Sequence, residues 1–214
     1  TLISLFALFL SLTLTAQTNP ATWYLNDFNL TGISSYSNSA SGTYSTAMGY
    51  QTLASGSYST SSGSYSTASG SYSTAMGYNS EASGGYSTAM GYETTASESW
   101  STAMGDRTIA SGLYSTAIGL LTKANGSRST AMGHNTTASG IVSTAIGQFT
   151  TASEYGSTAM GEGTTASDRS SLVMGQYNLA GSTVTTSATE FSLDNTALVI
   201  GNGADFDNRS DALV

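Results

Sequence analysis

The chain has 214 residues, of which 8% are charged, and it contains no cysteine, one proline and one histidine. This composition excludes disulfide frameworks, thiolate zinc sites and cysteine nucleophiles, and it leaves few side chains for catalysis. The net charge of −8 and only five Lys and Arg residues also argue against a phosphate-neutralising patch, so nucleic acid is not an expected partner.

Residues 1–16, TLISLFALFLSLTLTA, form an apolar run that ends at a small residue and is followed by a polar stretch. The pattern predicts a partial signal peptide without its charged start, and therefore export from the cytoplasm. The run is shorter than the about 20 apolar residues that span a bilayer. A buried N-terminal helix is the alternative. An N-terminal segment, 17–30, precedes the repeats.

A repeat of 14 residues fills the stretch 31–186. Its clearest mark is a pentad of the type STAMG, which begins without insertion at ten serines: Ser45, Ser59, Ser73, Ser87, Ser101, Ser115, Ser129, Ser143, Ser157 and Ser171. A second small motif, centred on Ala54 and its equivalents, lies halfway through each unit. Such fixed self-similarity indicates a solenoid in which each repeat packs on its neighbours. Fourteen residues are too few for a helix pair, so we predict an all-β solenoid with two short strands per coil.

Strand alternation assigns the side chains of each pentad to two faces. Ser45, Ala47 and Gly49 are expected to point one way, and Thr46 and Met48 the other. The second strand repeats the pattern with small residues on its inner side. The interior is therefore expected to be narrow and lined with Ser, Thr, Ala and Gly, and ten stacked coils would form a rod about 48 Å long.

The outward slot of the pentads forms an apolar stripe. Ser62 interrupts it, and packing should be looser there; the other nine positions are Met48, Met76, Met90, Met104, Ile118, Met132, Ile146, Met160 and Met174. A narrow interior has no room for these side chains, so the stripe predicts an interface between copies of the chain. A methionine ladder inside a wider monomeric solenoid is the alternative.

Aromatic residues stand immediately before the first six pentads: Tyr44, Tyr58, Tyr72, Tyr86, Trp100 and Tyr114. We call this set the aromatic ladder. If it is exposed, it is the candidate contact surface for an extracellular protein or glycan, because aromatic side chains offer large contact areas at little entropic cost. The preferred interpretation is that the rings stack on one another and stabilise the edges of the coils.

No catalytic, metal or cofactor site is predicted. His134 lies in a variable slot after a pentad, which is typical of a surface residue. The cluster Asp205, Asp207 and Asp211 resembles part of a calcium loop, but Arg209 stands where that pattern requires Asp or Asn. We therefore predict a solvated turn.

These pentads resemble the head repeats of trimeric autotransporter adhesins, similar to the head of the Yersinia adhesin. The family's 14-residue unit has a Ser-x-Ala-x-Gly strand followed by an Ala-x-Gly half-coil. Ser, Ala and Gly match in most units here, while Thr and Met occupy the slots in which the family usually has Val and Ile. The resemblance covers about residues 31–186. It implies a left-handed parallel β-roll, a side-by-side homotrimer with the apolar strand at the shared axis, and display at the cell surface or outer membrane.

The C-terminal β segment, 187–214, ends in mid-pattern and is therefore expected to be truncated; the stalk and membrane anchor by which that family attaches to the cell do not follow it here. We predict that the chain is not an enzyme and serves as an exported surface or fibre adhesin head, attaching to host or environmental surfaces. An ice-binding or other ligand-binding monomeric β-solenoid is the alternative. Outward threonines such as Thr95 and Thr137 suggest it, but Glu81, Ile109 and Lys123 interrupt their array.

Overall fold

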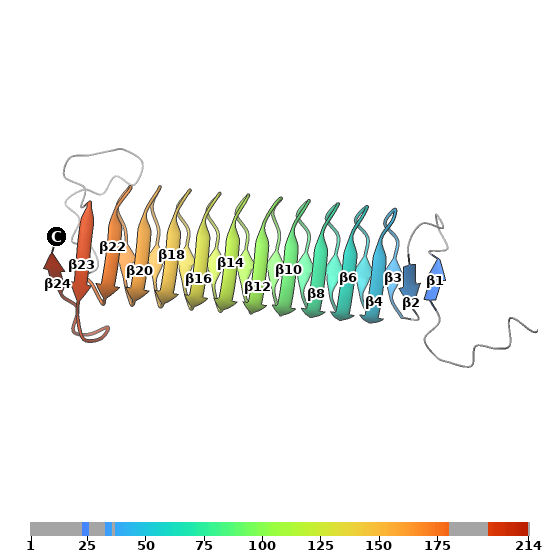
Figure 1. Ribbon diagram of the computed structural model, residues 1–214, viewed down its shortest axis with the longest axis horizontal. Coiled ribbons are helices and arrows are strands. Elements are labelled where there is room, and N and C mark those ends of the chain that lie inside the picture. Colours follow the sequence, from blue (N-terminus) through green and yellow to red (C-terminus); the bar gives the residue numbers. More distant parts are fainter. Residues whose placement is uncertain (1–22, 26–32, 36, 180–196, 214) are drawn as a thin grey trace, which may run out of the picture.

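The computed structural model describes residues 23–25, 33–35, 37–179 and 197–213. Within these ranges every regular element is a β-strand, and the strands stack along one axis into a rod (Figure 1). The parallel β-solenoid predicted from the repeat is confirmed. The signal peptide expected at 1–16 lies outside the described residues.

Two sheets run along the rod. The first has 14 strands, mostly of five residues: β1 (Trp23–Leu25), β2 (Ile33–Ser35), β4 (Thr46–Tyr50), β6 (Thr60–Ser64), β8 (Thr74–Tyr78), β10 (Thr88–Tyr92), β12 (Thr102–Asp106), β14 (Thr116–Leu120), β16 (Thr130–His134), β18 (Thr144–Gln148), β20 (Thr158–Glu162), β22 (Leu172–Gln176), β23 (Leu198–Asn202) and β24 (Asp211–Leu213). The second has 10 two-residue strands: β3 (Ser39–Ala40), β5 (Leu53–Ala54), β7 (Thr67–Ala68), β9 (Glu81–Ala82), β11 (Thr95–Ala96), β13 (Ile109–Ala110), β15 (Lys123–Ala124), β17 (Thr137–Ala138), β19 (Thr151–Ala152) and β21 (Thr165–Ala166).

Successive coils pair in parallel and in register. Met90 of β10 lies opposite Met76 of β8 on one side and Met104 of β12 on the other. The 14-residue period therefore places equivalent side chains in straight columns along the rod. Each position of the repeat becomes one column, and the chemistry of a column can be read directly from the sequence.

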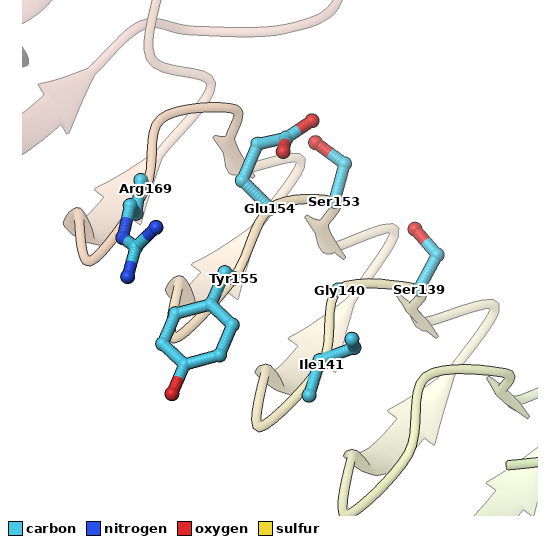
Figure 2. Close-up of a pocket in the computed structure, with 7 residues that line it drawn as sticks. All are labelled: Ser139, Gly140, Ile141, Ser153, Glu154, Tyr155 and Arg169. Atoms are coloured by element: carbon cyan, nitrogen blue, oxygen red, sulfur yellow. The ribbon is translucent and has the colours of Figure 1, made fainter. Parts of the chain in front are cut away.

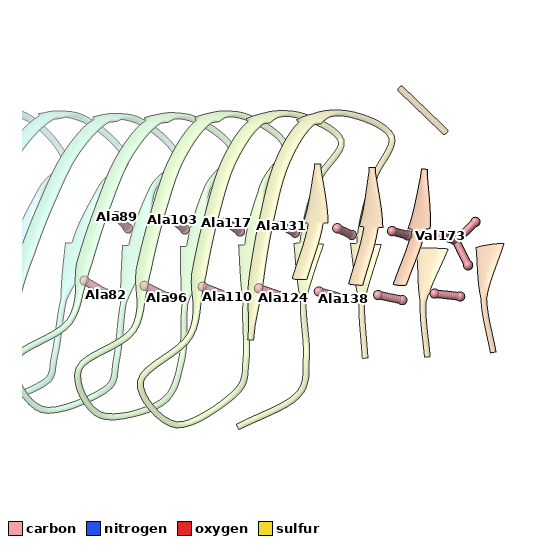
Figure 3. Close-up of a cluster of buried hydrophobic side chains, with 14 of the residues drawn as sticks. Ala82, Ala89, Ala96, Ala103, Ala110, Ala117, Ala124, Ala131, Ala138 and Val173 are labelled. Atoms are coloured by element: carbon pink, nitrogen blue, oxygen red, sulfur yellow. The ribbon is translucent and has the colours of Figure 1, made fainter. Parts of the chain in front are cut away.

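The core consists of two facing columns of alanine (Figure 3). Ala89 of the first sheet and Ala96 of the second are both fully buried, as are their equivalents in the neighbouring coils. Ser61 replaces alanine in one coil, and its Oγ donates a 2.8 Å hydrogen bond to the carbonyl oxygen of Ser66. The alanine cluster is divided at this coil. The small residues at these positions are what allow the two sheets to approach so closely.

The glycine that ends each pentad does not face the interior, contrary to simple alternation. Ser45 and Ala47 are buried as expected, but Gly49 is exposed and has a φ of 122°. A Cβ atom at Gly49 would overlap the carbonyl oxygen of Gly63 in the next coil. Glycine is therefore required here by its backbone conformation and by the close approach of adjacent coils.

Each coil turns at two corners whose residues adopt a left-handed backbone conformation. Tyr58 (φ 59°) occupies the first kind of corner and Tyr65 (φ 58°) the second. The amide of Tyr58 donates to the carbonyl oxygen of Thr43, and that of Tyr65 to Tyr50, in the preceding coil. For residues other than glycine this conformation costs on the order of 1–2 kcal/mol. The hydrogen bonds between coils help to offset that cost.

The C-terminal residues extend the first sheet and close its end. β23 pairs in parallel with β22, so that Val199 adds a buried side chain after Val173, and β24 then pairs antiparallel with β23. Arg209 Nη1 donates hydrogen bonds to the carbonyl oxygens of Gly163 (2.9 Å) and Asn178 (3.1 Å). The segment 197–213, which we call the C-terminal cap, is thereby tied to the last coils.

Candidate binding surfaces

The apolar stripe lies on the outer face of the first sheet. Strand pairing aligns its side chains, as Met104 with Ile118 and Ile118 with Met132. Met76, Met132 and Ile146 are 38–39% exposed in the single chain, and the other six members are half-buried. The structure thus aligns all nine residues in one column, which Ser62 interrupts between Met48 and Met76. Ile200 of the cap pairs with Met174 on the neighbouring strand and extends the column by one more apolar side chain.

The aromatic ladder also forms one continuous column, at the first kind of corner. Its neighbouring rings are stacked with centroids 4.7–5.1 Å apart, and the rings of the Tyr58–Tyr72, Tyr72–Tyr86 and Tyr86–Trp100 pairs are almost parallel, with interplanar angles of 3°. All six side chains are 46–58% exposed. The ladder is therefore both stacked and exposed. Its ring faces cover one another, and it presents mainly ring edges and hydroxyl groups to a ligand.

A second group of tyrosines gathers near the other kind of corner, and the repeat pattern did not single it out. This corner tyrosine cluster consists of Tyr50, Tyr65, Tyr78 and Tyr92, which are 44–51% exposed. Tyr65 meets Tyr50 and Tyr78 edge to face, at interplanar angles of 88° and 76°. Tyr78 and Tyr92 are stacked. Tyr50, Tyr78 and Tyr92 each follow a pentad directly, whereas Tyr65 stands one residue further along in its coil. The four residues therefore do not share one position of the 14-residue repeat, and its spacing does not predict the cluster.

Two members of the corner tyrosine cluster, Tyr65 and Tyr92, have raised pKa values. The hydroxyl of Tyr50 raises the pKa of Tyr65, with a smaller contribution from partial burial. The carboxylate of Glu93, which accepts a hydrogen bond, raises the pKa of Tyr92. The raised pKa values keep the hydroxyl groups of Tyr65 and Tyr92 uncharged over the physiological pH range, and the carboxylate of Glu93 borders Tyr92.

A shallow pocket of about 320 Å³ lies further along the rod, where the repeat is less regular. Figure 2 shows polar side chains along one edge and Ile141 and Tyr155 along the other; the lining residues include Ser139, Ile141, Ser153, Glu154, Tyr155 and Arg169. The guanidinium carbon of Arg169 lies 4.6 Å from the centroid of the Tyr155 ring. Burial, and then the negative charge of Asp168, raise the pKa of Glu154. The pocket offers hydroxyl and charged groups to a small polar molecule.

The other polar candidates lie apart from these surfaces. His134 is half-buried, its Nδ1 lies 3.4 Å from Gln148 Nε2, and its ring packs beside Phe149. Asp205 accepts hydrogen bonds from the backbone amides of Asp207 and Asn208, and the Asn208 side chain lowers its pKa. Asp211 instead accepts a hydrogen bond from the amide of Leu179. Across the described part of the chain, no three potential metal ligands converge.

Comparison with known proteins identifies the repeats. No curated protein matches the chain. The family described as YadA head domain repeat matches residues 40–66, 68–94, 101–121, 124–150 and 152–178. These stretches cover more than half of the chain and coincide with the coils of the rod. Within the described residues there is no helix long and apolar enough to cross a membrane. The chain belongs to the family of YadA head-domain repeats, the head module of trimeric autotransporter adhesins.

Proposed function

We propose that this protein is a non-enzymatic adhesin head, which is exported, assembles as a homotrimer along its apolar stripe, and attaches to host or environmental surfaces. The observation that carries the proposal is the stripe itself. A monomer would leave nine large apolar side chains half-buried or exposed along one column of its surface, and apolar patches of this kind mark interaction sites. Side-by-side packing of identical rods would cover the whole column at once, because its spacing is the same in every chain.

Attachment by such a head depends on multivalency. Several identical chains present the same weak contacts together, and linked contacts can exceed the affinity of a single contact by about 10²–10⁴. Low charge and a long repetitive surface suit this mode of binding better than catalysis. The family match also favours an adhesin head over the ice-binding alternative. Display outside the cell is part of the same proposal.

Bead adhesion would test the proposal. Beads that carry the head should adhere to arrays of matrix proteins or glycans, and beads with an equal number of M90D/M104D chains should adhere at least tenfold more weakly, because separated chains lose multivalency. The matched control is T95D/I109D, which places two acids on the outer face of the second sheet in the same coils. Equal adhesion by all three proteins, or adhesion by none, would contradict the proposal.

The role of the aromatic ladder can be separated in the same assay. We propose that its exposed edges contribute contacts to a ligand in addition to stabilising the corners. A Tyr72→Ser, Tyr86→Ser, Trp100→Ser variant that remains folded and assembled should then adhere more weakly than the unaltered head. Unchanged adhesion would leave the ladder with a stabilising role alone.

A further inference from the structure

The rod has no basic residue before Arg107, which is ion-paired with Asp106. Between positions 37 and 106 the sequence contains no Lys or Arg, although it contains Glu81, Glu93, Glu98 and Asp106. The same stretch carries nine Tyr and Trp side chains, all of them 44–58% exposed. This first half of the rod therefore combines an acidic balance with a dense array of exposed rings.

In the second half of the rod, arginines of the chain cover aromatic faces. Arg169 lies over Tyr155, and Arg209 lies over Phe206 at 5.1 Å and Tyr177 at 6.0 Å from the ring centroids. A guanidinium group within about 6 Å of a ring centroid is attracted by the negative face of the ring. The rings between positions 37 and 106 are comparably exposed, and the first cation after them, Arg107, lies beside Tyr92 and is ion-paired with Asp106.

The two aromatic columns of the first half differ in which part of the ring is free. In the aromatic ladder the faces are covered by parallel stacking. In the corner tyrosine cluster, Tyr78 stacks in parallel with Tyr92 and makes a T-shaped contact with Tyr65. Tyr65 is nearly perpendicular to both Tyr50 and Tyr78, so neither of these rings stacks in parallel on it. Its side chain is 44% exposed.

We propose that the corner tyrosine cluster, centred on the exposed and unstacked ring of Tyr65, binds arginine side chains of a basic segment in a partner protein. Charge complementarity selects this partner, since Glu93 borders the cluster and Arg107, the basic residue beside Tyr92, is ion-paired with Asp106. The ring of Tyr65 is exposed, and no ring stacks on it in parallel. The inference rests on the proposed adhesin function and adds the chemical class of the ligand. Arginine suits the site because its planar guanidinium stacks on aromatic faces.

Titration of the assembled head with a capped hexa-arginine peptide tests this proposal, with hexa-citrulline as a neutral peptide of nearly the same shape. Tyr65→Leu should weaken hexa-arginine binding about twofold to fivefold, the contribution of one exposed cation–π contact. Tyr65→Phe keeps the ring and should bind as the unaltered head does. The matched control is Tyr72→Leu, because Tyr72 has the same φ of 58° but lies in the stacked ladder.

These variants share one net charge, so differences among them report the ring and not the general attraction of an acidic protein for a basic peptide. Circular dichroism and light scattering confirm that each variant is folded and assembled. The proposal fails if Tyr65→Leu and the unaltered head bind hexa-arginine equally, or if hexa-citrulline binds as tightly. A head that adheres to surfaces without binding hexa-arginine would overturn this inference alone. A head that binds the peptide but adheres to no surface would contradict the adhesin function instead.

Discussion

At the scale of single residues, the fold depends on side chains that are absent or very small. Alanine columns set the distance between the two sheets, and glycine at the end of each pentad lets adjacent coils approach. Alternation predicted the buried alanines correctly but placed the pentad glycine inside. Side chains alternate between the inner and outer face only while the chain stays extended. At Gly49 the backbone leaves that conformation, and the pattern shifts.

Two glycines in neighbouring coils offer a direct comparison. Gly91 has a φ of 135°, and a Cβ there would overlap the carbonyl oxygen of Gly105, whereas a Cβ at Gly85 would find its nearest neighbour, Ser99 Oγ, at 3.6 Å. Gly91→Ala should lower the free energy of unfolding by about 1–3 kcal/mol from backbone strain, with the steric overlap adding to the loss. Gly85→Ala should be neutral or stabilising by up to about 1 kcal/mol. Urea denaturation measures both, and equal stability of the two variants would contradict this explanation.

At the scale of the elements, the sequence specified the strands, their parallel order and their register, because a repeat without insertions leaves one way to stack the coils. It specified the stripe and the ladder for the same reason. Features that break the period escaped prediction. Tyr65 stands one residue out of step with Tyr50, Tyr78 and Tyr92, and the period is interrupted before β23. The pocket beside Tyr155 depends on side chains that differ from coil to coil.

The C-terminal cap is an element whose attachment can be tested separately from the coils. Arg209→Ala removes two hydrogen bonds from a charged donor and the cation over Phe206. Each such hydrogen bond contributes about 1.5–3 kcal/mol. We expect hydrogen exchange to accelerate at least tenfold in the backbone amides of β23, and to stay unchanged in β8 and β10. The control is Arg128→Ala, at an exposed arginine in a middle coil. Unchanged exchange in β23 after Arg209→Ala would show that Arg209 does not hold the cap in place.

At the scale of the whole molecule, a rod with a core of alanines buries little apolar area within one chain, while its largest apolar side chains lie outside. Self-association of the rods would bury those side chains and also multiply every contact on the outer surfaces. The apolar stripe and the corner tyrosine cluster then have separate tasks. The stripe would hold identical chains together, and the cluster would meet the partner protein. In this proposal, burial of the stripe stabilises the head, and repetition of the cluster in each chain gives the head its avidity.

The most direct test of the account is the mass of the head in solution, measured by light scattering on the unaltered protein, M90D/M104D and T95D/I109D. Met90 and Met104 pair on adjacent strands, so two aspartates there would place unpaired charges in the middle of the interface, at a cost of about 3–5 kcal/mol each. The account predicts the mass of three chains for the unaltered protein and T95D/I109D, and of one chain for M90D/M104D. A folded single chain in all three samples would contradict it.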